Sequence, residues 1–229
     1  MRKIFNHILN FFFPNTCVVC NLRLAESEKH ICLSCLESLP KTNYHRQEEN
    51  RLEHYLGGKF IFNRAAAFCY FYKSGGVQKI IHELKYKNNP DLAVYMGKLY
   101  GNDLKDSDFL RNVDYLVPVP LHPKRQKQRG YNQAEEICKG ISEVTGIPVC
   151  TTLIVRAVNN PSQTSHSKTE RWKNVDGIFA SVNDISILEK TILVVDDVIT
   201  TGSTIEAIAK SFPEGKAPTI NIAALGIAT

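Results

Sequence analysis

Apolar positions along the chain change their spacing repeatedly, and this change predicts alternating strands and helices. Residues 191–195 form an uninterrupted apolar run that is largely β-branched, which is typical of a strand buried on both faces. In contrast, Val77, Ile80, Ile81 and Leu84 recur at the spacing of one helix face. Further strands are expected at 65–72, 113–119, 153–155, 177–180 and 220–225, and further helices from residue 90 onward, at 133–145 and at 205–209. Strands that alternate with helices predict an open, doubly wound α/β sheet that is mostly parallel, with helices on both faces.

The chain is long enough for one main domain with a small appendage. It has 229 residues, of which 43% are hydrophobic, so it can bury a full core. Residues 1–40 are expected to form a cysteine-based module. The polar stretch at 41–53 is interpreted as a linker or an exposed turn, which makes residues 41–64 the connection to a main domain at 65–229.

The N-terminal apolar run, Ile4–Phe13, follows basic residues and superficially resembles a signal peptide. No small-residue cleavage site follows it, Pro14 ends it, and it is too short to span a bilayer. A short helix that packs on the next module is expected, with weak contact to a membrane surface as the alternative. We therefore expect a cytoplasmic protein with no stable membrane insertion.

Four of the seven cysteines form two Cys-x2-Cys pairs. They are Cys17, Cys20, Cys32 and Cys35, and this spacing predicts four thiolates around one tetrahedral Zn²⁺. Disulfides and free thiols are the alternatives, but a reducing cytosol disfavours the first and chance rarely produces two such pairs. Because protein takes all four positions, the zinc is expected to be structural. His30 is a nearby substitute ligand, although a surface histidine is the simpler interpretation.

Two carboxylates and a hydroxyl-rich turn follow the strand at 191–195. Asp196 and Asp197 stand at its carboxyl end, where they can accept hydrogen bonds from ribose hydroxyls or hold Mg²⁺ through water. The turn that follows opens a helix, and the unpaired amides of a helix start attract phosphate. The turn consists of Thr200, Thr201, Gly202, Ser203 and Thr204, whose hydroxyls can donate to a 5′-phosphate and whose glycine permits close approach.

The sequence thus predicts a sugar-phosphate site at this turn. A solvated acid pair before an ordinary capped helix is the alternative, but such a helix needs only one capping residue. The turn lacks the Gly-Lys pair of a P-loop, which argues against a P-loop ATPase.

A set of basic residues follows the strand at 113–119. Lys124, Arg125, Lys127 and Arg129 lie in a segment interpreted as a loop. Because the carboxyl ends of parallel strands meet at one edge, this loop and the turn at 200–204 should face a common crevice. Arginine forks and lysine charges suit a pyrophosphate, and the net charge of +5 fits a polyanionic ligand. A solvated loop or a nucleic-acid contact is the alternative.

The segment 156–175 is long, polar and without apolar periodicity, which is typical of a lid. We expect it to close over a charged sugar and to bring Lys168, Arg171 or Lys173 to the leaving group. Its Trp172 either stacks on a base or anchors the loop to the core.

Together these segments resemble the ComF/GntX family of phosphoribosyltransferase-like proteins over nearly the whole chain. Residues 191–204 are similar to the PRPP-binding motif of type I phosphoribosyltransferases at every position. The other segments that carry the resemblance are the two cysteine pairs, residues 82–86, residues 117–123 with 129–133, and Ser162, Gln163, Arg171 and Asn174. It implies a type I phosphoribosyltransferase fold and a PRPP-like ligand, or ribose phosphate, bound with Mg²⁺. In the competence members it also implies partners that handle incoming single-stranded DNA.

Two functions agree with these features. The first is an enzyme that transfers ribose phosphate from PRPP to an acceptor, with Mg²⁺ and basic residues neutralising the pyrophosphate while the two aspartates orient the ribose. The second is a non-catalytic module that senses PRPP or binds single-stranded DNA, because fold alone does not imply catalysis. The sequence identifies no acceptor.

Overall fold

The computed structural model of the chain describes residues 15–156, 172–173, 178–182, 187, 189–213, 215 and 217–228. Its helices are α2 (Leu33–Glu37), η1 (Tyr44–Arg46), α3 (Arg51–Leu56), α4 (Gly76–Tyr86), α5 (Pro90–Lys105), η2 (Asp108–Leu110), α6 (Pro123–Arg129), α7 (Gln133–Thr145) and α8 (Ser203–Ala209). Its strands are β1 (Arg64–Phe71), β2 (Tyr115–Pro118), β3 (Ile154–Arg156), β4 (Trp172–Lys173), β5 (Phe179–Val182), β6 (Thr191–Ile199) and β7 (Thr219–Ala228).

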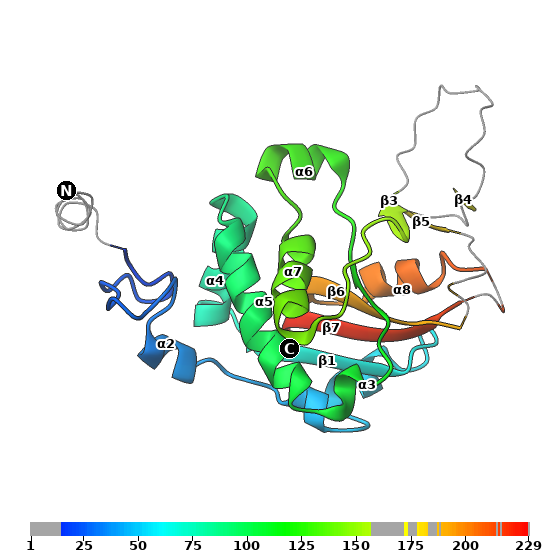
Figure 1. The fold of residues 1–229 in the computed structure, drawn as a ribbon, viewed down its shortest axis with the longest axis horizontal. Helices are drawn as coiled ribbons and strands as arrows, with labels where there is room; N and C mark the ends of the chain where they lie inside the picture. The colour runs from blue at the N-terminus through cyan, green and yellow to red at the C-terminus, as the bar shows by residue number, and fades with distance from the viewer. Residues whose placement is uncertain are drawn as a thin grey trace.

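The centre of the molecule is a parallel sheet with the strand order β1-β7-β6-β2. Its strands β1, β7 and β6 are labelled in Figure 1. A parallel bridge between Leu116 and Val149 extends it beyond β2. The middle of β6, residues 192–195, and most of β7, residues 222–228, are apolar, as expected for strands of a sheet that helices cover on both sides.

Helices lie on both faces of the sheet. α5 and α7 pack against each other and contact β7, β6 and β2. α8 returns the chain from β6 to β7 on the opposite face, since right-handed crossovers that move in opposite directions along a sheet lie on opposite faces. The predicted class, an open and mostly parallel α/β fold with a small N-terminal cysteine module, is confirmed.

Most predicted elements are found within a few residues of their expected bounds. The helix expected at 133–145 is α7, and the strands expected at 65–72 and 220–225 are β1 and β7. The strands expected at 153–155 and 177–180 are found at Ile154–Arg156 and Phe179–Val182, but not in the parallel sheet. They become β3 and β5 of a separate antiparallel sheet with the order β3-β5-β4. Short apolar runs predict a strand without specifying its partner, and that is why the expected pairing was wrong.

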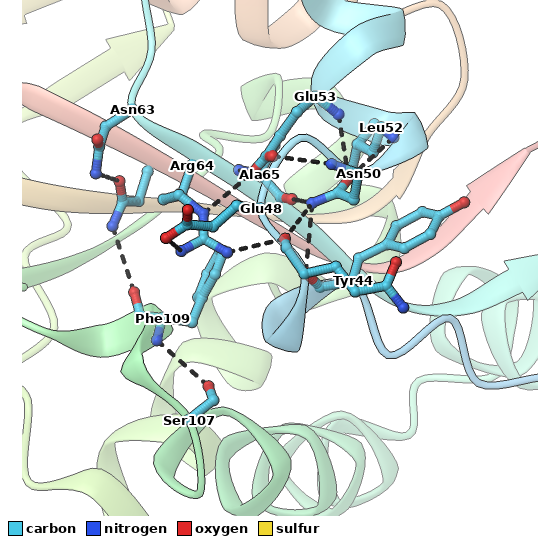
Figure 2. Close-up of polar contacts among 12 residues, drawn as sticks. Tyr44, Glu48, Asn50, Leu52, Glu53, Asn63, Arg64, Ala65, Ser107 and Phe109 are labelled. Atoms are coloured by element: carbon cyan, nitrogen blue, oxygen red, sulfur yellow. Dashed lines mark hydrogen bonds and ion pairs between the residues drawn. The ribbon is translucent and has the colours of Figure 1, made fainter.

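The segment 41–64 differs from the expected linker because it folds against the sheet. Asn50 is buried and caps α3, with its side-chain oxygen accepting from the amides of Leu52 and Glu53 at 3.0 and 3.2 Å. Its side-chain nitrogen donates to the carbonyl of Ala65 at 2.9 Å. Glu53 in turn accepts from Arg64 Nε at 3.1 Å and from the amide of Ala65 at 2.9 Å (Figure 2).

A chain of amide contacts continues across the start of β1 and β7. Asn63 donates to Asn221 at 2.9 Å, and Asn221 donates to the carbonyl of Phe109 at 3.5 Å (Figure 2). We call the set formed by Asn50, Glu53, Asn63, Arg64 and Asn221 the amino-end network. Asn50 and Asn221 are buried, Glu53 and Arg64 are partly buried, and the polar groups of the network bond to one another and to the backbone, so the segment is polar in sequence and nevertheless part of the folded structure.

The cysteine module packs directly on the main domain. Cys17 and Ile31 are fully buried in the same apolar cluster as the sheet residues. The space beside Gly76 at the start of α4 is filled by Val19, and Lys79 donates to the Val19 carbonyl at 2.5 Å. Among the described residues, no helix has the length and apolar character needed to cross a membrane.

Candidate functional site

A cleft opens at the carboxyl ends of β2 and β6. After β2 the chain runs outward to the bridge at Val149, and after β6 it runs the other way to β7. In open α/β sheets, the point where neighbouring strands diverge in this manner leaves a crevice for ligands. The cavity there measures about 380 Å³, and we call it the strand-end cleft. Its charged and hydroxyl lining consists of Lys85, Arg125, Arg129, Arg156, Asp196, Asp197, Thr200 and Thr204.

The two aspartates lie at the base of this cleft, inside β6 and short of its end. The amide of Asp197 donates to Asp196 Oδ1 at 2.8 Å. Burial, followed by the neighbouring charge of Asp197, raises the pKa of Asp196 to about 7. Asp197 itself forms an ion pair, with its Oδ2 3.1 Å from Nζ of Lys85. The structure therefore brings both predicted acids to the cleft, but one of them already has a cationic partner.

The turn after β6 is only partly directed into the cleft. Thr200 and Thr204 line it, whereas Thr201 and Ser203 do not belong to its lining, and their hydroxyl oxygens lie 2.9 Å apart. Gly202 has a φ of +79° and caps α8. A Cβ at this position would lie 2.5 Å from Cδ2 of Leu56, which belongs to α3. We predicted this glycine to permit the close approach of a ligand, but the group that approaches it is a protein side chain.

The basic segment after β2 is a helix and not the loop that we expected. α6 begins with Pro123, whose preceding His122 accepts from the amide of Lys124 at 3.1 Å, and ends at Gly130 with a φ of +84°. None of its residues is buried, so it has no apolar periodicity for a sequence pattern to detect. Proline at the start and glycine after the end were the only available signals.

The helical form of α6 divides the four predicted pyrophosphate residues into two sets. Arg125 and Arg129 are four residues apart, and both line the strand-end cleft. Residues with this spacing share one helix face. Lys124 and Lys127 are exposed and do not belong to its lining. Arg129 is held in place by Gln133, whose side-chain oxygen accepts from its Nη1 at 2.9 Å.

Two cationic residues of the cleft were missed by sequence reasoning. Lys85 comes from α4 and Arg156 from the end of β3, so their positions in the sequence are far from the aspartates. Arg156 Nε is buried with no hydrogen-bond partner among the described atoms, and its guanidinium carbon lies 5.2 Å from the ring centre of Phe179. Burial, and then the charge of Arg125, lower the pKa of Arg156. A buried donor without a partner marks a position where an anion can bind.

A second cavity adjoins the cleft between the end of α4 and α6. We call it the α4–α6 pocket; it measures about 580 Å³. Its lining residues are Lys85, Tyr86, Asn88, Arg125, Gln128 and Arg129, and three of them also line the strand-end cleft. Three cations and no carboxylate line this pocket, so its chemistry favours an anion.

Two of the three predicted lid residues, Lys168 and Arg171, lie outside the described residues. Lys173 belongs to β4, where its backbone pairs with Ser181 of β5. Its role at the leaving group stays a prediction.

The four cysteines of the N-terminal module come together as predicted. The sulfur atoms of Cys17, Cys20, Cys32 and Cys35 all lie within 4.8 Å of one another. The sulfurs of Cys20 and Cys32 are 3.8 Å apart, which matches the edge of about 3.8 Å for a tetrahedron with metal–sulfur bonds of about 2.3 Å. The cluster can therefore hold one tetrahedral metal ion.

Backbone amides favour the thiolate form of Cys17 within this cluster. Burial opposes ionisation of Cys17, but hydrogen bonds from the backbone of Cys32, Cys20 and Val19 outweigh it and lower its pKa to about 6. The amides of Val19 and Cys32 each lie 3.4 Å from the Cys17 sulfur. His30 is not part of the cluster, because its ring packs against Tyr95 with a centroid distance of 5.5 Å.

Known proteins of several bacteria are similar to this chain. Competence protein F of Haemophilus influenzae is 25% identical over 210 residues, which is 87% of this chain and 91% of that protein. DNA utilization protein YhgH of Salmonella typhimurium is 27% identical over 146 residues, 62% of this chain and 63% of that protein. Competence protein ComFC of Bacillus subtilis is 34% identical over 107 residues, 46% of this chain and 41% of that protein.

Comparisons with family models and solved structures add less. No family model matches the chain. Adenine phosphoribosyltransferase from Saccharomyces cerevisiae aligns with 62% of this chain and 72% of its own, at 13% identity and a TM-score of 0.42.

Proposed function

The chain belongs to the ComF family, and from this premise we propose that its strand-end cleft binds PRPP together with Mg²⁺. The observation that supports this most directly is the charge arrangement of one cavity. Asp196 and Asp197 form its base, while Lys85, Arg125, Arg129 and Arg156 reach it from α4, α6 and β3. A ligand with hydroxyls at one end and a pyrophosphate at the other matches these two halves.

Each part of the ligand has a proposed partner. The 5′-phosphate binds at the turn formed by residues 200–204, where Thr200 and Thr204 face the cleft. The ribose hydroxyls donate to Asp196 and Asp197, which also hold Mg²⁺ through water. The pyrophosphate binds to Arg125, Arg129 and Arg156, whose Nε has no hydrogen-bond partner among the described residues.

The reaction that follows from this arrangement is transfer of ribose phosphate to an acceptor. Positive charge develops on the ribose ring as the bond to pyrophosphate breaks, and carboxylates below the ring stabilise it. The departing pyrophosphate is neutralised by the arginines, and bound Mg²⁺ supplies further charge at the leaving group. Since the relatives are named for competence and DNA utilization, we place this activity in the uptake of DNA, in the cytoplasm.

Calorimetric titration with PRPP and Mg²⁺ tests this site. Replacing Asp196→Asn with Asp197→Asn should weaken PRPP binding at least 100-fold. Asp114→Asn is the matched control, because Asp114 accepts from the amide of Thr191 at 2.9 Å at the opposite ends of the same strands. Retention of full PRPP affinity by the double variant would refute the assignment.

We also propose that the cysteine cluster holds a structural Zn²⁺. The purified protein should contain about one zinc per chain, as expected for a closed four-thiolate site. Cys20→Ser should lose most of the metal. Cys150→Ser should keep it, because Cys150 is a free thiol outside the cluster. Full zinc content in Cys20→Ser would contradict the proposal.

A second candidate function is binding of single-stranded DNA without catalysis. The exposed lysines of α6, Lys124 and Lys127, point to it, together with the rings of Tyr72 and Tyr86, which are 48% and 67% exposed. Under this hypothesis the double aspartate variant keeps its DNA affinity. The affinity falls steeply with salt, since phosphate contacts release counterions. Loss of DNA binding together with PRPP binding in that variant would place both ligands in the strand-end cleft.

A further inference from the structure

Lys85 occupies a position between the two cavities. Its side chain lines the strand-end cleft and the α4–α6 pocket, and its Nζ lies 3.1 Å from Oδ2 of Asp197. Both partners are largely buried, with side chains 26% and 13% exposed. Among the described residues, no carboxylate lies within ion-pair distance of Arg125, Arg129 or Arg156, so Lys85 is the one cation of the cleft with an acidic partner.

In the free protein, the ion pair between Lys85 and Asp197 offsets the repulsion between two neighbouring acids. Asp196 and Asp197 are adjacent, and burial, followed by the neighbouring charge of Asp197, raises the pKa of Asp196. The ammonium group of Lys85 lies 3.1 Å from Asp197 Oδ2 and offsets negative charge at the two acids without a metal. A divalent cation that approaches the two acids therefore has to displace a charge that is already in place.

Lys85 also lines the α4–α6 pocket, where its ammonium group could bind after leaving Asp197. The remaining cations of the α4–α6 pocket are Arg125 and Arg129, and the pocket has no carboxylate that would hold an ammonium group. A pyrophosphate bound by these two arginines would attract it. Lysine suits such a movement, because its compact charge is carried on a flexible four-carbon stem, whereas an arginine fork would hold Asp197 with two parallel bonds.

We propose that Lys85 exchanges partners during ligand binding: it neutralises Asp197 in the free protein and moves to the pyrophosphate when a divalent cation takes its place. This inference rests on the proposed function, because it assumes a metal-bound pyrophosphate in the strand-end cleft. It assigns Lys85 to both the metal and the pyrophosphate halves of the site.

The exchange predicts opposite effects on two simple probes. In Lys85→Met, which keeps most of the apolar stem, Mn²⁺ alone should bind the free protein about 5- to 10-fold more tightly, since a competing charge near the acids is gone. Inorganic pyrophosphate, titrated in the presence of EDTA, should bind about 10-fold more weakly, because one cation of its site is lost. Lys87→Met is the matched control; Lys87 is exposed at the end of α4 and lines neither cavity, so both affinities should stay within about twofold.

A double-mutant cycle separates this exchange from a general disturbance of the site. In an Asp197→Asn background, Lys85→Met should no longer tighten Mn²⁺ binding, because the competed carboxylate is absent. Weaker binding of both probes in Lys85→Met, unchanged binding of either, or no measurable Mn²⁺ binding by any variant would overturn the proposal. If the unmodified protein binds no PRPP, the proposed function fails, although the Mn²⁺ comparison still tests the competition. If it binds PRPP and the two probes do not move in opposite directions, only the exchange fails.

Discussion

The polar groups at the two ends of the parallel sheet differ in how fully they are hydrogen-bonded within the protein. At the amino end, Asn50, Glu53 and Arg64 bond to one another and to the backbone of β1 (Figure 2). At the carboxyl end, the strand-end cleft holds an acid with a raised pKa and an arginine nitrogen that has no hydrogen-bond partner within the part of the chain that the structure describes. A network that is fully bonded within the protein adds stability, whereas charges left unmatched are available to a ligand.

Asn50→Ala should show the largest effect on stability and almost none on ligand binding. The variant loses the cap of α3 and leaves the carbonyl of Ala65 without its donor. We expect a loss of about 3 kcal/mol in the free energy of unfolding, measured by urea denaturation. Asn102→Ala on the exposed side of α5 should change it by less than about 0.5 kcal/mol. PRPP affinity below the melting temperature should be the same for both. An unchanged unfolding free energy for Asn50→Ala would mean that the network does not stabilise the fold.

Asp196→Asn should instead stabilise the free protein, and the gain should depend on pH. The folded chain keeps the proton of Asp196 up to about pH 7, whereas the unfolded chain loses it near pH 4. The unmodified protein therefore loses stability as the pH rises through this interval, and the neutral asparagine does not.

At pH 8 in EDTA we expect the Asp196→Asn variant to be more stable by about 2 kcal/mol, with the difference disappearing near pH 4. Thermal unfolding at the two pH values measures it. A gain that is independent of pH would show that packing, and not the charge of Asp196, is responsible.

Arg125 and Arg129 should matter more than the two lysines of the same helix. Arg125→Ala with Arg129→Ala and Lys124→Ala with Lys127→Ala remove the same charge from α6, but only the arginines line the cleft. The arginine pair should weaken pyrophosphate binding about 30-fold, because charge-assisted bonds to phosphate are lost. The lysine pair should weaken it by less than about threefold and mainly at low salt. Equal losses would mean that α6 acts through its overall charge.

The sequence predicts the central sheet well because its strands carry long apolar runs and its helices carry one apolar face. It predicts the acids of the cleft because Asp196 and Asp197 directly follow such a run. It does not predict α6, which buries no residue and has no pattern to detect. Lys85 and Arg156 were missed for a different reason: only the path of the chain through the sheet brings α4 and β3 to the acids, and no local spacing encodes that path.

α3 links the amino-end network to the turn at residues 200–204, and a substitution in this turn has the smallest expected effect. It begins in the amino-end network with the cap of Asn50 and ends at Leu56, which lies against Gly202. Lys59, just beyond α3, donates to the carbonyl of Thr201 at 3.0 Å. The turn at residues 200–204 is therefore supported by the same segment that packs against the start of β1.

Gly202→Ala should cost about 1–2 kcal/mol of stability, because a left-handed φ disfavours alanine and its methyl would collide with Leu56. Combining it with Leu56→Ala should remove the collision but not the backbone cost, so the two changes together should destabilise by less than the sum of their separate effects. Unfolding by urea of the four proteins in this cycle gives the coupling. Strict additivity would mean that Leu56 does not press on the turn, and that the need for glycine there comes from its backbone conformation alone.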